Sequence, residues 1–167
     1  LGSNYYAHLL KDGSSDATME TLLQNLEYSA TTHVNRHVRA AAIAVLEQLI
    51  VAAGNDPQYW ELLESGGLRK STVKILKAGL ADNWSQVRMA ASVLNRVFWT
   101  TLQETCQFPT SNLEKLYPVL VPRMCLNRFY LAQGVKLYSH QTWKMVFPNN
   151  GAQAVAQTIA PVVRYYV

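Results

Sequence analysis

One short pattern occurs twice in this chain and constrains its fold more than any other feature. The segment Val-Arg-Ala-Ala-Ala-Ile-Ala-Val begins at Val38, and the related segment Val-Arg-Met-Ala-Ala-Ser-Val-Leu begins at Val87, 49 residues later. A sequence that repeats itself after some tens of residues is typical of a structure that stacks one small unit many times. Because the apolar residues follow helical spacing, the repeat predicts an all-α protein built from successive helix pairs.

The spacing of apolar residues places two well-marked helix pairs near residues 16–54 and 68–105. A shift of 49 residues lays Met19 of the first pair on Leu68 of the second. A looser third pair is predicted near residues 111–147. The first two pairs are thus expected to have the same internal packing.

Residues 152–167 begin a further, partial repeat. We therefore expect a single domain over residues 1–167 with about three to four repeats. The last three residues are apolar, whereas a terminal repeat normally has a polar outer face. This end indicates that the chain is part of a longer array.

The composition is that of a folded domain, since 49% of the residues are apolar. No apolar run of about 18 uncharged residues is present, and the N-terminus lacks the pattern of a secretory signal, so we expect an intracellular, cytoplasmic or nuclear protein with no membrane contact. Cys106 and Cys125 have no ligand-like spacing, which favours buried, reduced thiols over a disulfide.

Charge is distributed unevenly along the chain. Residues 1–67 carry three basic and eight acidic residues, whereas residues 68–167 carry twelve basic and three acidic residues. Such asymmetry attracts an acidic partner or nucleic acid to the basic half, but it also arises as ordinary variation of surface charge. Both readings stay open on the sequence.

The segment Asp-Asn-Trp-Ser-Gln-Val-Arg-Met-Ala-Ala, residues 82–91, resembles a HEAT repeat, and residues 35–41 resemble it also. The resemblance implies an α-solenoid in which a turn acid and the arginine of the Val-Arg pair form a ladder between neighbouring repeats. Asp82 and Arg88 occupy those places, and Arg39 occupies the arginine place of the first pair. The first pair departs from the pattern at Asn35, and the third has Leu131-Ala132 where Val-Arg is expected.

Most HEAT and armadillo arrays are scaffolds that hold another protein along a concave face. The resemblance therefore implies a non-catalytic module that binds a protein partner through the concave face formed by the second helix of each pair. The oligomeric state is left open.

A basic stripe is the strongest candidate surface site. Lys136, His140 and Lys144 are four residues apart and share one helix face. Arg128 precedes them, and Arg96 lies on the preceding second helix. If second helices line the concave face, these residues can bind acidic side chains or phosphates, so nucleic-acid binding is the alternative function. An ordinary solvated helix face is the competing interpretation.

Aromatic residues are the other potential nucleic-acid contacts, because bases stack on exposed rings. In stacked amphipathic helices such rings more often fill the core. The residues concerned are Trp60, Trp84, Trp99 and Trp143, with Tyr117, Tyr130 and Tyr138 flanking the basic stripe.

The sequence contains no pattern that predicts catalysis, a cofactor or a metal. His33 and His37 are four residues apart but straddle a predicted turn, so they do not match a helical metal pair. DNA glycosylases built on HEAT-like repeats need an acid in an aromatic cleft, for which Asp82 or Glu104 beside Trp84 and Trp99 is the nominal candidate. We expect a protein that is not an enzyme.

Overall fold

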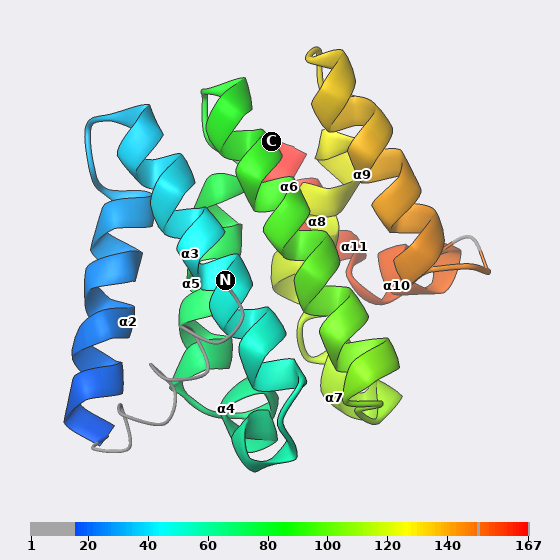
Figure 1. The fold of residues 1–167 in the computed structure, drawn as a ribbon. Coiled ribbons are helices and arrows are strands. Elements are labelled where there is room, and N and C mark those ends of the chain that lie inside the picture. The colour runs from blue at the N-terminus through cyan, green and yellow to red at the C-terminus, as the bar shows by residue number, and fades with distance from the viewer. Residues whose placement is uncertain (1–15, 150, 167) are drawn as a thin grey trace.

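The computed structural model describes residues 16–149 and 151–166; residues 1–15 of the expected domain lie outside this part. The described residues form helices and no β-strand. The prediction of an all-α protein is therefore confirmed. Figure 1 shows the helices packed together.

The chain order is simple. The described helices are α2 (Asp16–Thr31), α3 (Arg36–Gly54), the 3-10 helix η1 (Pro57–Tyr59), α4 (Trp60–Glu64), α5 (Gly67–Gly79), α6 (Ser85–Thr100), the π-helix η2 (Thr101–Thr105), α7 (Thr110–Glu114), α8 (Tyr117–Asn127), α9 (Gln133–Val146), α10 (Ala152–Gln157) and α11 (Ile159–Tyr166).

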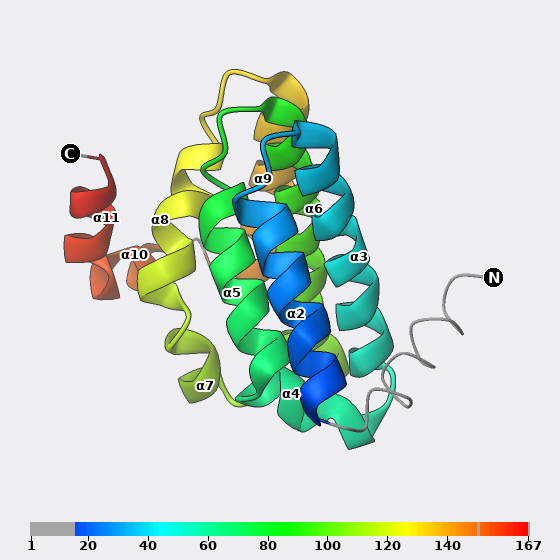
Figure 2. The same cartoon turned by 90° about the vertical axis from the view of Figure 1, so that its left-hand side faces the viewer.

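The long helices lie in two layers (Figures 1 and 2). One layer contains α3, α6 and α9 in that order, with α6 packed against both of its neighbours. The other layer contains α2, α5 and α8, and α11 packs against α8. Each helix of the first layer follows its partner in the second layer along the chain. We call the exposed surface of α3, α6 and α9 the second-helix face.

The core runs between the two layers. Helix α3 contributes Ile43, Leu46 and Leu49, and α6 contributes Leu94 and Phe98, all with no exposed surface. By length and composition alone, α3 is the one described helix apolar enough to cross a membrane, but it packs against α2, α5 and α6. Its buried residues, among them Ile43, Leu46 and Leu49, form part of the core.

Gly79 of α5 lies in close contact with both α3 and α6. A Cβ atom built on this glycine would lie 2.8 Å from the Cβ of Ala91 and 3.2 Å from the Cδ1 of Ile43. No side chain fits at that separation, so the close contact of the first two pairs requires glycine here.

The third pair follows the second after 48 residues, whereas the first two pairs are 49 residues apart in the sequence. Helix α9 begins at Gln133, and the buried positions of α6 recur 48 residues later. The matched pairs are Val87 with Val135, Ala91 with Ser139, Leu94 with Thr142, and Phe98 with Val146. The structural counterpart of Val-Arg is thus Val135-Lys136 and not Leu131-Ala132, because those two residues still belong to the turn.

Two expected helices are divided in the structure. Residues 111–126 form α7 and α8 with a break at Lys115, close to Pro118 in the first turn of α8. Proline has no backbone N–H to continue a preceding helix, which explains the break. The final segment is similarly divided between α10 and α11.

The cysteines are free and buried. Burial raises the pKa of the Cys106 thiol to about 11 and also raises the pKa of Cys125. Both thiols are therefore in the protonated, weakly nucleophilic form at neutral pH.

Candidate functional site

A largely but not fully buried ion pair links the first two helix pairs. The guanidinium of Arg39 on α3 donates from Nε to Oδ2 of Asp82 at 2.9 Å and from Nη2 to Oδ1 at 3.2 Å. Arg39 also donates to the backbone carbonyls of His33 and Val34 at the end of its own turn. Asp82 in turn accepts the backbone N–H of Trp84 at 2.9 Å. This arginine and this aspartate therefore hold two turns together.

A second polar link joins the next two pairs. Arg88 is almost completely buried and donates to the amide oxygen of Asn127 at 2.8 Å, and to the carbonyls of Leu80 and Asp82. Asn127 completes the link by donating to the same Leu80 carbonyl at 3.0 Å. The ring of Tyr130 packs against the guanidinium at 4.1 Å. Arg88 therefore connects the second pair to the turn of the third.

Sequence reasoning identified Arg39, Asp82 and Arg88 but not Asn127. Because the third pair has no Val-Arg-Ala-Ala segment, nothing in its sequence aligned Asn127 with Asp82. The one sequence signal for Asn127 was its polar side chain at the end of the first helix of the third pair, 45 residues after Asp82.

Arg96, the first member of the predicted basic stripe, is engaged in packing between α6 and α9. It donates from Nε to the hydroxyl of Thr142 at 2.9 Å and from Nη2 to the carbonyl of Tyr138 at 2.9 Å. Its guanidinium also lies 3.4 Å from the centre of the Tyr138 ring. Its donors are thus largely directed to α9 rather than to a partner.

Arg128 and His140 belong to a different cluster, on the flank of α9 that faces away from α6. The guanidinium of Arg128 lies 4.1 Å from the ring of Trp143, and the ring of Phe129 lies edge-on to His140 at 5.9 Å. Cation–π contact and partial burial hold Arg128 in place.

The two lysines of the predicted stripe have different surroundings. Lys136 is the 48-residue counterpart of Arg88, so it lies on the flank of α9 that faces away from α6, whereas Lys144 is exposed on the second-helix face. Successive residues of an α-helix are rotated by about 100°, which places Tyr138 and Thr142, the partners of Arg96, on the opposite flank from Lys136. The structure therefore brings Arg128, Lys136 and His140 to one flank and separates Arg96 from them.

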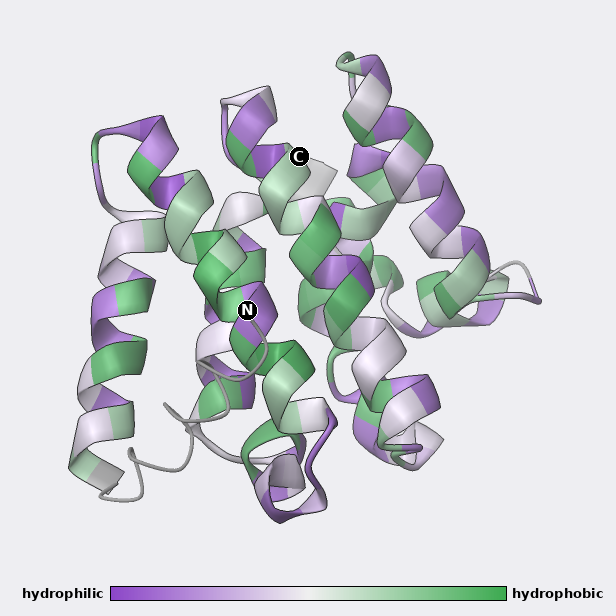
Figure 3. Cartoon of the chain, in the orientation of Figure 1, coloured by the Kyte–Doolittle hydropathy of each residue, from purple (hydrophilic) through white to green (hydrophobic). Residues whose placement is uncertain are grey.

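The second-helix face has exposed apolar residues on each of its three helices, and Figure 3 shows hydrophobic residues interspersed with hydrophilic ones along α3 and α6. Its partly or fully exposed apolar residues are Ala41, Ala44 and Val51 on α3, Met89, Val93 and Val97 on α6, and Leu137 and Met145 on α9. Polar groups lie among them. Burial raises the pKa of the carboxyl group of Glu47 on α3, and Lys144 supplies a cation on α9.

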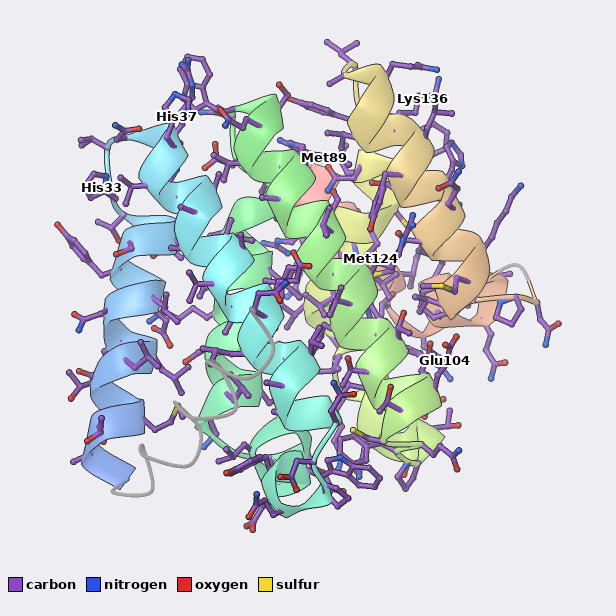
Figure 4. All side chains as sticks on the ribbon, in the orientation of Figure 1. His33, His37, Met89, Glu104, Met124 and Lys136 are labelled. Atoms are coloured by element: carbon purple, nitrogen blue, oxygen red, sulfur yellow. The ribbon has the colours of Figure 1, made fainter. Side chains whose placement is uncertain are left out.

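The nominal catalytic constellation does not come together. Asp82 and Trp84 precede the first residue of α6, whereas Glu104, labelled in Figure 4, lies in η2 beyond the other end of that helix. Trp99 is fully buried, and both carboxylate oxygens of Asp82 are bonded within the protein. These residues form no common cleft.

The histidine pair is likewise held by other contacts. His33 Nδ1 accepts the backbone N–H of Asn35 at 3.1 Å, and His37 Nδ1 lies 3.3 Å from the side-chain amide of Gln86. Within residues 16–149 and 151–166, the structure contains no group of three or more His, Cys, Asp or Glu side chains suited to a metal ion.

No protein-family model, curated protein or solved structure matches this chain. Function is therefore inferred from the residues and their geometry alone.

Proposed function

We propose that this chain forms an α-solenoid of the HEAT-repeat type and acts as a non-catalytic intracellular scaffold. In this proposal, the second-helix face binds an amphipathic segment of a protein partner. The order of packing supports the solenoid, because each helix pair contacts the next one along the chain. The cross-pair bonds of Arg39 and Arg88 support it further, since each reaches the turn of the following pair.

One observation carries the binding proposal: apolar side chains are exposed on all three second helices. Leu137 on α9 is 52% exposed, Met145 is also exposed, and Met89, Val93 and Val97 on α6 are partly exposed between the flanking helices. Contiguous exposed apolar surface bordered by polar residues is typical of protein-binding sites. Helices with apolar residues at positions i, i+3 and i+4 bind such surfaces.

The charges of this face favour an acidic partner segment at its α9 side. Lys144 is exposed there, in the last turn of α9. The basic residues do not favour nucleic acid, because Arg96 and Arg128 are engaged with Thr142 and Trp143 and few free cations remain on one surface.

To test the proposal, the purified chain is used to capture proteins from cell extract. Cross-linking and mass spectrometry then identify the proteins that contact it directly. Leu137→Glu places a charge on the second-helix face at an exposed position, so it leaves the fold intact. Tyr28→Glu, on α2, is the matched control, since Tyr28 is 62% exposed on the other layer.

The Tyr28→Glu variant is expected to capture as much of a direct partner as the unsubstituted chain, whereas Leu137→Glu is expected to capture at least tenfold less. Calorimetry with the purified partner is expected to show the same tenfold difference in affinity between the two variants. Equal capture by the two variants would contradict the proposal. The nucleic-acid alternative would be supported instead if the chain bound labelled DNA or RNA at low salt and Lys144→Glu reduced that affinity.

A further inference from the structure

A second surface lies along one edge of the molecule, where the turn within each helix pair exposes apolar side chains. Figure 1 shows the turns α2–α3, α5–α6 and α8–α9 at the same edge, with the N-termini of α3, α6 and α9 beside them. The exposed fractions are 92% for Val34, 50% for Trp84, 67% for Phe129 and 96% for Leu131. We call this surface the turn edge.

The turn edge is hollowed between the first two pairs. A shallow depression of about 310 Å³ is lined by Val34, Asn35, Arg36, His37 and Trp84. Its walls come from both pairs, so its shape depends on their packing. Of its lining residues, Figure 4 labels His37, at the start of α3.

Contacts between the pairs fix the side chains of this depression. The guanidinium of Arg36 lies 4.3 Å from the centre of the Trp84 ring, and the imidazole of His37 lies beside the amide of Gln86. Within the described residues, the structure gives Arg36 no carboxylate partner. The planar donors of Arg36 therefore remain free to bind a carboxylate in bidentate fashion.

The charge of the turn edge is one-sided. The first turns of α3, α6 and α9 contain no acidic residue. The carboxylate of Asp82 is already bonded to Arg39 and to the Trp84 backbone. Arg36 and Lys136 are cations at this edge with no ion-pair partner among the described residues, and the helix N-termini add partial positive charge.

We propose that the turn edge at Arg36 and Trp84 binds an acidic peptide segment that carries an apolar side chain. A carboxylate of the peptide pairs with Arg36, and an adjacent apolar side chain covers Val34 and the exposed part of Trp84. A peptide is favoured over a nucleic acid because one face of Trp84 is already covered by Arg36 and the depression offers a single free guanidinium rather than a row of phosphate contacts. This site is independent of the second-helix face.

A random twelve-residue peptide library displayed on phage and selected on the full chain tests the proposal. The enriched peptides are expected to contain Asp or Glu next to a Leu, Phe or Trp. Synthetic copies are expected to lose at least tenfold in affinity for Arg36→Glu and at least fivefold for Arg36→Gln. Lys70→Glu is the matched control, because Lys70 is an exposed cation at the start of α5, far from the turn edge, and it should change affinity less than twofold.

Trp84 supplies a readout that does not depend on charge, since its fluorescence is expected to change when the peptides bind. Circular dichroism and the melting temperature establish that each variant is folded. The proposal is overturned if selection enriches no acidic peptides, if Arg36→Glu and Lys70→Glu bind them equally, or if a short oligonucleotide displaces them from the site.

Discussion

Two arginines link the turns of neighbouring helix pairs, and their partners differ in charge. Arg39 contacts the carboxylate of Asp82, whereas Arg88 contacts the neutral amide of Asn127. The Arg39–Asp82 pair is shielded from water, with 11% and 15% of the two side chains exposed. Removing one member of such a pair leaves the other buried without a counter-ion.

Asp82→Ala is expected to destabilise the chain by about 3 kcal/mol, because it leaves Arg39 unpaired and also removes the acceptor for the Trp84 N–H. Asp56→Ala is the matched control: Asp56 accepts the backbone N–H of Gln58 at the start of η1, and its loss is expected to cost about 1 kcal/mol. Urea unfolding followed by circular dichroism measures both. Equal losses for the two variants would show that the ion pair contributes nothing beyond capping.

Glu27 joins α2 to α5 at the residue scale. Burial alone would raise the pKa of its carboxyl group, but the hydrogen bonds from Lys74 and Ser71 and the charge of Lys74 outweigh burial and lower it. Ser71 donates to Oε1 at 2.7 Å, and Lys74 pairs with Oε2. A lowered pKa means that the contribution is present above the ordinary pKa of a glutamate and disappears as the pH falls through the folded-state value.

Glu27→Gln is therefore expected to reduce stability at pH 7 by about 0.5–1 kcal/mol, a modest effect because Lys74 is largely exposed. The difference from the unsubstituted chain should shrink toward zero near pH 3. Chemical denaturation at both pH values measures it. Glu20→Gln is the control, since Glu20 contacts Gln24 of its own helix. A difference that grows in acid would contradict the assignment.

At the scale of elements, the junction of α3, α5 and α6 depends on the small residue Gly79. A methyl group there would overlap Ala91, whereas a methyl group at Gly134, in the first turn of α9, meets no atom within 4 Å. Alanine substitutions at the two glycines therefore distinguish the effect of packing on stability from the effect of helix propensity.

Gly79→Ala is expected to destabilise the chain by about 1–3 kcal/mol through overpacking. Gly134→Ala is expected to stabilise it by up to about 1 kcal/mol, because alanine favours helix more than glycine does. Thermal and urea unfolding provide the comparison. If Gly79→Ala were also stabilising, α5 would not approach α3 and α6 as described.

The sequence allowed prediction of the elements where local signals agreed. The bounds of α2 and α3 follow from apolar spacing, and the match between residues 38–45 and 87–94 predicted that α3 and α6 have equivalent environments. The third pair was harder, because Lys136 replaces arginine and Ser139 and Thr142 replace apolar residues. The break at Lys115 and the contacts of Arg96 depend on tertiary packing, which no local pattern encodes.

The candidate site was predicted less well than the fold. Helical spacing predicted one shared face for Lys136, His140 and Lys144, but it could not indicate which neighbouring helix each side chain meets. Arg128 reaches this flank through its contact with Trp143, whereas Arg96 is drawn to Tyr138 on the other side. The relevant surface depends on the position of α9 relative to α6 and α8.

At the scale of the whole molecule, the account depends on helix pairs that follow one another side by side. In Figure 1, α6 lies between α3 and α9, which leaves all three second helices with an exposed side. A closed bundle would instead bring α3 against α9 and bury that surface. Both proposed binding surfaces require the open arrangement, because it lines up the second helices and the turns.

The most direct test measures the separation of α3 and α9. Ala44 on α3 and Gln141 on α9 are exposed and occupy the positions equivalent to Val93 on α6. Spin labels at these two residues therefore report the separation of α3 and α9. Cysteines are introduced there after Cys106 and Cys125 are replaced by alanine. Neighbouring helices pack about 8–10 Å apart, so two steps predict about 16–20 Å between the α3 and α9 axes. A separation of about 10 Å, the value for helices in direct contact, would contradict the stacked arrangement.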